Sequence, residues 1–412
     1  MNLSGRITQC RSCGCDSLTS VLDLGEQPWC NDFLSKEAVG KEKSYPLHVV
    51  HCNECELLQL NHTVPKETMF SDHCYLSGVT KTLVDHFFDV AKENVEQFSI
   101  KNDDLVVDIG GNDGSQLLQY KALGVENVLN VECSSRVSQI SKDNGVPTIT
   151  KFFNEECVDK HLENNSVKLY NASGVFFHLE ELHSVIRAIK KTLRNDGVLI
   201  VQFMYAGTMI EKLNFDTIYH EHLCYYTLRS LRNLLKPYCL DIFDAFYSDI
   251  HSGSIIAKIS HSNGILDVKT NRFQELLEKD RRYTLDAFLD FSRTIQNKKD
   301  ELRINLKKIK DSGKTIYAYG APAKGNTLLN YFKIDYRLID KAVEINDLKI
   351  GNHLPGSHIP IRREDKEDRP DYYLLLSHNF EKEIINKNQD IIKRGTKFII
   401  PFPVYKVLGE DR

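Results

Sequence analysis

Apolar residues in the middle of the chain form short runs that alternate with segments of helical spacing. The run at 105–109 is rich in valine and isoleucine, and 127–132 repeats this strand character. Between 81 and 98, apolar side chains recur at the three- and four-residue intervals of a helix. Further strands are expected at 168–172, 175–179 and 198–203. This alternation predicts a doubly wound parallel sheet with right-handed crossovers.

A second α/β pattern follows residue 315. Residues 315–320 form an apolar run, and the segment from 321 turns into a helix. Further strands are expected at 342–345, 372–376 and 397–400, which would complete a smaller sheet. Between the two patterns, residues 270–311 are rich in Lys, Glu, Leu and Arg with helical spacing. This segment is expected to be a long helical connector that is mostly solvated.

The N-terminal region carries weaker patterning. Residues 45–50 alternate between apolar and polar positions and predict a strand, whereas 22–28 look turn-rich. A small domain of short strands is therefore expected before the first parallel sheet.

Length and charge limit the classes of function open to the chain. With 412 residues it can hold two or three domains, each with its own core. A net charge of -4 and a pI near 6.4 offer no electrostatic basis for binding nucleic acid or an anionic membrane. No apolar run approaches the roughly 18 residues of a membrane span, and the N-terminus lacks a secretory pattern. We therefore expect a soluble, cytoplasmic protein.

Eleven cysteines, an odd number, include two Cys-x-x-Cys pairs: Cys10 with Cys13, and Cys52 with Cys55. In a reducing compartment this spacing favours a metal over disulfides. Four thiolates complete the tetrahedral coordination of zinc, and a site closed in this way has a structural role. Cys15 is a competing ligand, and a thioredoxin-like redox use of either pair is the alternative.

A glycine-rich turn follows the strand at 105–109 and carries the strongest cofactor pattern in the chain. Glycines let a ligand approach the backbone, and the start of the next helix attracts an anionic group. The G-x-G-x-x-G spacing of dinucleotide sites is absent. An acid ends the next strand, where a ribose diol is held in doubly wound sheets. The pattern favours S-adenosylmethionine over NAD, and the alternative is a turn without a nucleotide. The candidate cofactor-binding residues are Asp108, Gly110, Gly111, Asn112, Asp113, Gly114 and Glu132.

Four consecutive residues from Tyr219 to His222 bring together a phenol, two imidazoles and a carboxylate. The segment resembles the His-Glu-x-x-His zinc motif, but Cys224 occupies the last position, so the motif fails. His220 and His222 would share a face only in an extended segment. Acid–base chemistry is one interpretation, because imidazole titrates near neutral pH. Hydrogen-bonded histidines at a strand end are the other, and the same two interpretations apply to His178.

The helix start after residue 321 contains Lys324, Gly325 and Asn326. A lysine and free amides at a helix start form a plausible cradle for a pyrophosphate. It is not a Walker A loop, because the Gly-Lys-Ser/Thr order is missing.

Taken together, these segments resemble the three-domain sugar C-methyltransferases that act on nucleotide-linked keto-deoxysugars. The resemblance covers nearly the whole chain and rests on the order of its motifs. They are the two cysteine pairs and the segments 75–78, 108–114, 219–222, 251–254, 319–327 and 354–356. It implies a zinc domain at 1–70, a Rossmann-like S-adenosylmethionine domain at 71–270, and a helical connector with a smaller α/β domain at 271–412.

The resemblance also implies the roles of individual residues. His222 would be the base, and Tyr75, His178, Tyr219 and Glu221 would line the sugar site. The implied substrate contacts are Ser254, Lys324, Gly325, Asn326 and Asn379. The chain departs from the family pattern at 172–178, which lacks an Asn-Val pair before the histidine, and at 377–379, which lacks a tryptophan before the asparagine.

Carbon methylation beside a ketone is the hypothesis that fits these residues. An imidazole would remove the proton on the carbon next to the carbonyl, which is C-3 of a 4-keto-6-deoxysugar. The resulting enolate would then attack the methyl donor. Two other classes stay open: an O- or N-methyltransferase acting on RNA or a small molecule, and a non-catalytic nucleotide-sugar binder. A monomer is expected, because a third domain would cover the crevice.

Overall fold

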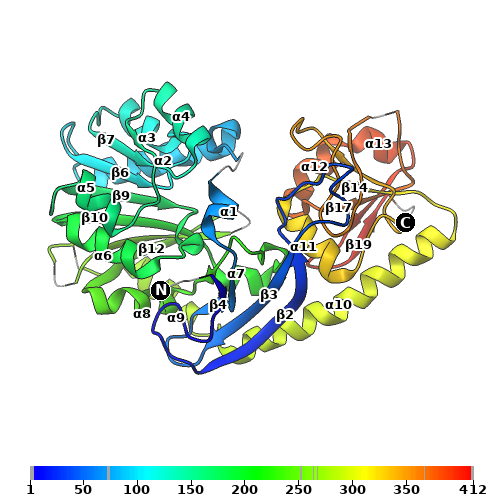
Figure 1. Ribbon diagram of the computed structural model, residues 1–412, viewed down its shortest axis with the longest axis horizontal. Helices are drawn as coiled ribbons and strands as arrows, with labels where there is room; N and C mark the ends of the chain where they lie inside the picture. Colours follow the sequence, from blue (N-terminus) through cyan, green and yellow to red (C-terminus); the bar gives the residue numbers. More distant parts are fainter. Residues whose placement is uncertain are drawn as a thin grey trace.

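Two large sheets with parallel cores stand at opposite ends of the molecule, as Figure 1 shows. The computed structural model describes residues 4–71, 75–250, 253–262, 264–266, 268–365 and 367–409. An antiparallel ribbon and the long helix α10 (Leu285–Asp311) run between the two sheets. The arrangement confirms the predicted mixed α/β class.

The N-terminal sheet is antiparallel, in the order β11-β4-β3-β2. Its strands are β2 (Leu18–Pro28), β3 (Ser44–Cys52), β4 (Leu58–Leu60) and β11 (Cys224–Tyr225). The turn-rich reading of 22–28 is wrong, because these residues lie within β2. The register of β2 shifts twice against β3, and Gly25 adopts a φ of +74°. Such bulges allow turn-forming residues within a strand. Pro28 is tolerated because β2 is an edge strand, in which not every backbone N–H is needed for pairing.

Short elements complete the N-terminal part. They are β1 (Gly5–Arg6), β5 (His62–Thr63), α1 (Lys66–Phe70) and η1 (Ser77–Val79). β1 pairs with β5 in a separate two-stranded sheet.

The middle sheet has seven strands in the order β12-β13-β10-β9-β6-β7-β8. They are β6 (Leu105–Ile109), β7 (Val128–Val131), β8 (Thr148–Ile149), β9 (Val167–Ser173), β10 (Leu193–Met204), β12 (Leu240–Ser248) and β13 (Ser254–His261). From β10 to β8 the strands run parallel, and β12 and β13 form an antiparallel edge. The doubly wound prediction is confirmed.

Helices cover both faces of this sheet (Figure 1). The helices of this domain between β5 and β12 are α2 (Lys81–Gln97), α3 (Ser115–Ala122), α4 (Ser135–Asp143), α5 (Glu155–His161), α6 (Leu182–Thr192), α7 (Ala206–Glu211) and α8 (Leu228–Leu235). Because both faces are covered, β9 and β10 are buried almost throughout.

Within the described part of the middle domain, 3₁₀ turns interrupt the loops at η2 (Phe176–His178), η3 (Phe215–Thr217) and η4 (Lys236–Tyr238). The strand predicted at 175–179 is therefore wrong. Gly174 takes a φ of +72° directly after β9 and ends the strand, so the next residues coil into η2.

The predicted connector consists of two helices, α9 (Asn271–Asp280) and α10. The side chain of Thr284 accepts a hydrogen bond from the Ala287 amide and so starts α10 as a separate helix. α10 is not only a solvated face, because Phe288, Ile295 and Leu306 are fully buried along it.

The C-terminal sheet has six strands in the order β16-β15-β14-β17-β18-β19, and only β19 runs antiparallel to its neighbour. They are β14 (Ile316–Tyr319), β15 (Lys341–Glu344), β16 (Ile361–Arg363), β17 (Tyr372–Leu375), β18 (Lys397–Ile400) and β19 (Lys406–Leu408). The accompanying helices are α11 (Ala323–Phe332), η6 (His378–Phe380), α12 (Glu381–Lys387) and α13 (Gln389–Lys393).

Candidate active site

The glycine turn between β6 and α3 leaves no room for side chains. Gly110 and Gly114 have φ values of +64° and +80°, which favour glycine. A Cβ on Gly111 would stand 2.5 Å from Asn130 Oδ1 and 2.7 Å from Asp108 Cγ. Only glycine therefore fits at these positions of the turn.

Glu132 follows the end of β7 beside this turn and is buried. Its carboxylate accepts hydrogen bonds from the amides of Asn112 (3.2 Å) and Ser134 (2.7 Å). Each carboxylate oxygen can accept more than one bond, so Glu132 can still hold a ribose diol. Burial, together with the charge of Glu132, raises the pKa of Asp108 well above its usual value. The residues fit the predicted S-adenosylmethionine site.

The segment that precedes α2 is fastened onto the glycine turn by its backbone. The Asn112 side chain accepts from the Ser77 amide and donates to the Tyr75 carbonyl oxygen, both at 3.0 Å. Asp113 accepts from the Gly78 amide at 2.8 Å. Tyr75 therefore stands at the cofactor turn, with its side chain 57% exposed. Its predicted place in a sugar site stays a prediction.

His222 has one ring nitrogen engaged by the backbone. Its Nδ1 lies 2.6 Å from the carbonyl oxygen of Thr217, so Nδ1 donates its hydrogen there. In the neutral ring, Nε2 then carries the lone pair that can accept a proton. The side chain is only 3% exposed. The ring centroids of Tyr219, Phe177 and His178 lie 3.8, 4.8 and 5.0 Å from that of His222.

His178 connects this cluster to the cofactor turn. Its Nδ1 donates to the carbonyl oxygen of Glu221 at 2.6 Å, so its Nε2 is also the acceptor nitrogen in the neutral ring. His178 belongs to η2, and Val175 at the start of this turn packs against Gly110. Val175 thus brings the turn that carries His178 next to the glycine turn, at the carboxyl ends of the neighbouring strands β6 and β9. The predicted approach of His222 to the cofactor stays a prediction.

Glu221 faces the N-terminal domain. Its Oε1 accepts hydrogen bonds from Trp29 Nε1 and Asn31 Nδ2, each at 2.6 Å. Burial, followed by the charge of Glu221, raises the pKa of Tyr219 well above its usual value, so its hydroxyl stays protonated. Sequence reasoning missed Trp29 and Asn31. Their only signal was the single tryptophan of the chain, placed in an otherwise polar loop.

His220 is distinct from His222. Residues 219–221 form a turn and not an extended segment, so the two rings do not share a face. His220 Nε2 donates to the Tyr45 carbonyl oxygen at 3.2 Å, and the two rings meet edge to face. Burial lowers the pKa of His220 to about 4, which keeps it neutral. We assign His220 a structural role at the contact with the N-terminal domain.

The four predicted zinc ligands converge in space. The sulfur atoms of Cys10, Cys13, Cys52 and Cys55 all lie within 4.8 Å of one another. Tetrahedral zinc–thiolate bonds of about 2.3 Å would separate the sulfurs by about 3.8 Å, so the cluster fits zinc. Within the described part of the chain, Cys15 is not a member of the cluster.

Comparison with known proteins gives the same three parts in the same order. Family models match a zinc binding domain at residues 10–70, a methyltransferase domain at 84–242 and a C-methyltransferase C-terminal domain at 249–403. The chain is 29% identical over 412 residues to C-methyltransferase NovU of Streptomyces niveus, with 98% of each chain covered. The chain is thus a methyltransferase with these three matched domains, and it is similar over its whole length to a C-methyltransferase. The enzyme therefore uses S-adenosylmethionine as its methyl donor.

Solved structures resemble only part of the enzyme. The PH0226 protein of Pyrococcus horikoshii has a TM-score of 0.37 at 12% identity, covering 48% of the enzyme and 98% of that chain. The mitomycin 7-O-methyltransferase MmcR has a TM-score of 0.35 at 13% identity, covering 44% of the enzyme and 54% of that chain. Similarity at this level carries no argument about function. Within the described ranges, no helix has the length and apolar character needed to cross a membrane.

The candidate substrate residues of the C-terminal domain are mostly engaged by protein. The Asn326 side chain donates to the Cys30 carbonyl oxygen at 2.6 Å, and Gly325 is buried against Leu376. Lys324 lies in the first turn of α11, where burial lowers its pKa and the charge of Asp216 opposes this effect. The enzyme thus places Lys324 beside a carboxylate from the middle domain.

The other two candidate substrate residues are Ser254 and Asn379. Ser254 opens β13 and accepts a hydrogen bond from Gln202 at 3.0 Å. Asn379 lies in η6, and its side chain is outside the described residues, as are His251 and Ser252. Their roles in the enzyme stay predictions.

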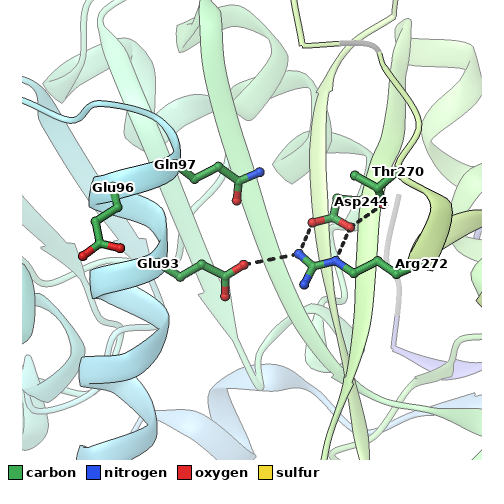
Figure 2. Close-up of a pocket in the computed structure, with 6 residues that line it drawn as sticks. All are labelled: Glu93, Glu96, Gln97, Asp244, Thr270 and Arg272. Carbon is green, nitrogen blue, oxygen red and sulfur yellow. Dashed lines mark hydrogen bonds and ion pairs between the residues drawn. The ribbon is translucent and has the colours of Figure 1, made fainter.

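A shallow hollow between α2 and β12 is lined by charged side chains that pair with one another (Figure 2). Arg272 forms ion pairs with Asp244 and Glu93, and Thr270 donates to Asp244 at 2.6 Å. Lys258, buried beneath, pairs with Glu93 at 2.7 Å. Because these charges neutralise one another, we interpret the hollow as an ion-pair network that holds α2 against the sheet edge.

Proposed function

We propose that the enzyme methylates C-3 of a nucleotide-linked 4-keto-6-deoxysugar through an enolate that His222 generates. The observation that carries the proposal is the hydrogen bond from His222 Nδ1 to the Thr217 carbonyl oxygen. It orients the ring and fixes the tautomer in which Nε2 is the basic nitrogen. The nucleotide sugar is supported by the resemblance described above and by the lysine at the start of α11.

Carbon methylation needs a base because a sugar carbon is a poor nucleophile. Removal of the proton beside a ketone gives an enolate, in which negative charge develops on the ketone oxygen. Tyr219 is suited to donate a hydrogen bond to that oxygen, because its raised pKa keeps the hydroxyl protonated. Its ring centroid lies 3.8 Å from that of His222, so base and donor act on the same end of the substrate.

The cofactor supplies an electrophilic methyl group on a sulfonium sulfur. The chain contributes proximity: Val175, at the start of η2, packs on Gly110, and His178 ends the same turn. Holding both reactants in one crevice replaces an improbable encounter in solution and supplies much of the rate enhancement. Burial of His222 also keeps bulk water away from the enolate.

Deuterium exchange at C-3 tests the proposal without the methyl donor. The enzyme is incubated in deuterated water with a panel of nucleotide 4-keto-6-deoxyhexoses, and loss of the C-3 proton is followed by NMR. Wild type should exchange it, and His222→Asn should lose about 10²- to 10⁴-fold in rate while still binding S-adenosylmethionine. His220→Asn is the matched control and should exchange at the wild-type rate. Near wild-type exchange by His222→Asn would overturn the assignment of the base.

Mass spectrometry of the products then separates the classes of methyltransferase. With the methyl donor added, a methyl group on a sugar carbon supports the proposal. A methyl group found only on oxygen or nitrogen, with no exchange at C-3, would contradict the proposed carbon methylation.

A further inference from the structure

The turn η3, which contains Thr217, the hydrogen-bond partner of His222, packs against the C-terminal domain. Phe215, the first residue of η3, is fully buried and stacks on Phe332 of α11, with ring centroids 5.1 Å apart and planes at 13°. Phe402 meets the same ring edge to face at 5.4 Å. Thr327 of α11 donates from its hydroxyl to the Ile218 carbonyl oxygen at 3.0 Å. Both ends of the turn are therefore held by the C-terminal domain.

Asp216 lies within the same turn and faces His378. Its carboxylate oxygen Oδ2 stands 3.6 Å from His378 Nδ1, and the side chains are 1% and 5% exposed. Among the described residues, both carboxylate oxygens and both ring nitrogens are buried without a hydrogen-bond partner. Lys324 and Glu381 also face His378 and act on its pKa in opposite directions.

These contacts occupy the point where the strand order of the C-terminal sheet reverses. α11 follows β14 and η6 follows β17, and these two strands are neighbours from which the chain winds in opposite directions. In open α/β sheets this crevice is where ligands bind. Here a turn from the middle domain reaches it, so the C-terminal domain is in contact with the base-bearing segment.

Thr217 is the residue between the two held positions. Its neighbours Asp216 and Ile218 contact His378 and Thr327, and its own carbonyl oxygen accepts from His222 Nδ1. A shift of this turn would therefore move the acceptor that orients His222. Misplacement of a catalytic group by about 1 Å can cost about 100-fold in rate.

We infer that the C-terminal domain positions the base, through Thr327 and His378, in addition to any contact it makes with substrate. Thr327 and His378 are positioning residues that act through Asp216, Thr217 and Ile218. The inference rests on the proposed function of His222, and it adds a role for the C-terminal domain that substrate binding does not require.

Removal of the Thr327 hydroxyl tests the inference. Thr327→Val keeps the shape of the side chain and removes the donor. The rate of C-3 exchange should fall about 10- to 100-fold, with unchanged KM for the nucleotide sugar and unchanged Kd for S-adenosylmethionine. Thr327→Ser restores the hydroxyl and should recover most of the rate. Thr294→Val on α10 is the matched control, because that hydroxyl bonds only to its own helix, at the Asp290 carbonyl oxygen.

A double-mutant cycle tests whether the two contacts act on one turn. His378→Phe keeps a ring and removes the nitrogen that faces Asp216. Thr327→Val and His378→Phe loosen the same residues. The double variant should therefore lose less exchange rate than the product of the two single fold losses. A rise in KM alone, or a full product of the two losses, would overturn the inference.

Nitrogen-15 NMR of the histidine rings separates this inference from the proposed function. Wild-type His222, assigned by loss of its signal in His222→Asn, should show a protonated Nδ1, and Thr327→Val should show a mixture of tautomers. This readout needs no substrate, so it holds even if no keto-sugar exchanges. Retention of the wild-type tautomer in Thr327→Val would overturn the positioning role, whereas absence of exchange by wild type would overturn only the proposed function.

Discussion

The rings of His178 and His222 lie with centroids 5.0 Å apart and planes tilted by 52°, and each donates from Nδ1 to a backbone carbonyl oxygen. The acceptor of His178 is Glu221, the residue before His222, so His178 also supports the segment that carries the proposed base. Two imidazoles with the same tautomer thus stand together, and their contributions can be separated by substitution.

Replacement of His178 should be less damaging than replacement of His222. His178→Asn removes the contact with the Glu221 carbonyl oxygen but leaves the proposed base in place. We expect a loss of about 10-fold in kcat for methyl transfer, against at least about 100-fold for His222→Asn. Initial rates of both variants at saturating cofactor measure this. The reverse order would assign the base to His178.

Tyr219→Phe should lower kcat about 10²- to 10³-fold, because it removes the proposed donor to the enolate oxygen. Since the pKa of Tyr219 is raised well above its usual value near 10, its hydroxyl stays protonated across the working range. The wild-type rate should then show no loss from tyrosine ionisation between pH 7 and about 10. A pH–rate profile of both proteins checks this, and a tyrosine-dependent fall near pH 8 would contradict it.

Gly111→Ala should weaken cofactor binding. The added methyl group would meet Asn130 Oδ1 at 2.5 Å and Asp108 Cβ at 2.8 Å, so the turn must shift. Overpacking costs about 1–3 kcal/mol, which corresponds to about 5- to 150-fold in Kd for S-adenosylmethionine. Titration calorimetry measures the change. Gly124→Ala is the control: its φ of +87° strains the backbone after α3, but the added methyl meets no atom within 4 Å, so stability should fall while Kd stays unchanged.

Zinc removal should unfold the N-terminal sheet and also reduce activity. β11 belongs to this sheet and directly follows the segment that carries His222, so loss of the metal should disturb the active site. We expect one zinc per chain by elemental analysis, and a fall in Tm with loss of turnover on chelation. Cys13→Ser should lose the metal, whereas Cys15→Ser should keep it. Retained zinc in Cys13→Ser would show that this cysteine is not a ligand.

The contact between Glu42 and His358 should make stability depend on pH. Burial opposes ionisation of Glu42, but hydrogen bonds from its own backbone, from His358 and from the Gly356 amide outweigh it and lower its pKa. A lowered pKa stabilises the fold above the unfolded value near 4.3, and this contribution is lost as pH falls through the folded pKa. Tm should therefore fall more steeply below pH 5 in wild type than in Glu42→Gln. Equal slopes would show that this carboxyl contributes little.

Local sequence predicted the parts of the site that are made by neighbouring residues. The glycine turn needs only a strand, a few glycines and a helix start, and each Cys-x-x-Cys pair needs only one short loop. The strand at 175–179 was wrong because a single backbone angle at Gly174 decides whether the run continues, and hydrophobicity does not report that angle. At 22–28 the sequence predicted turns and the structure has a strand. The prediction was wrong because bulges let a strand contain turn-forming residues.

The sequence by itself determined the class of the protein: a doubly wound sheet followed by a smaller α/β sheet, a cofactor turn, a set of zinc ligands and an imidazole-rich segment, all encoded within short stretches. Only the tertiary structure separated the surroundings of His220 from those of His222, the base that the resemblance implies. His220 and His222 are chemically identical, and a turn directs one toward Tyr45 and the other toward His178. It also placed Trp29, Asn31 and Thr327 around the same segment. Such contacts join residues more than 100 positions apart, and they arise from the packing of whole domains, which local patterns do not encode.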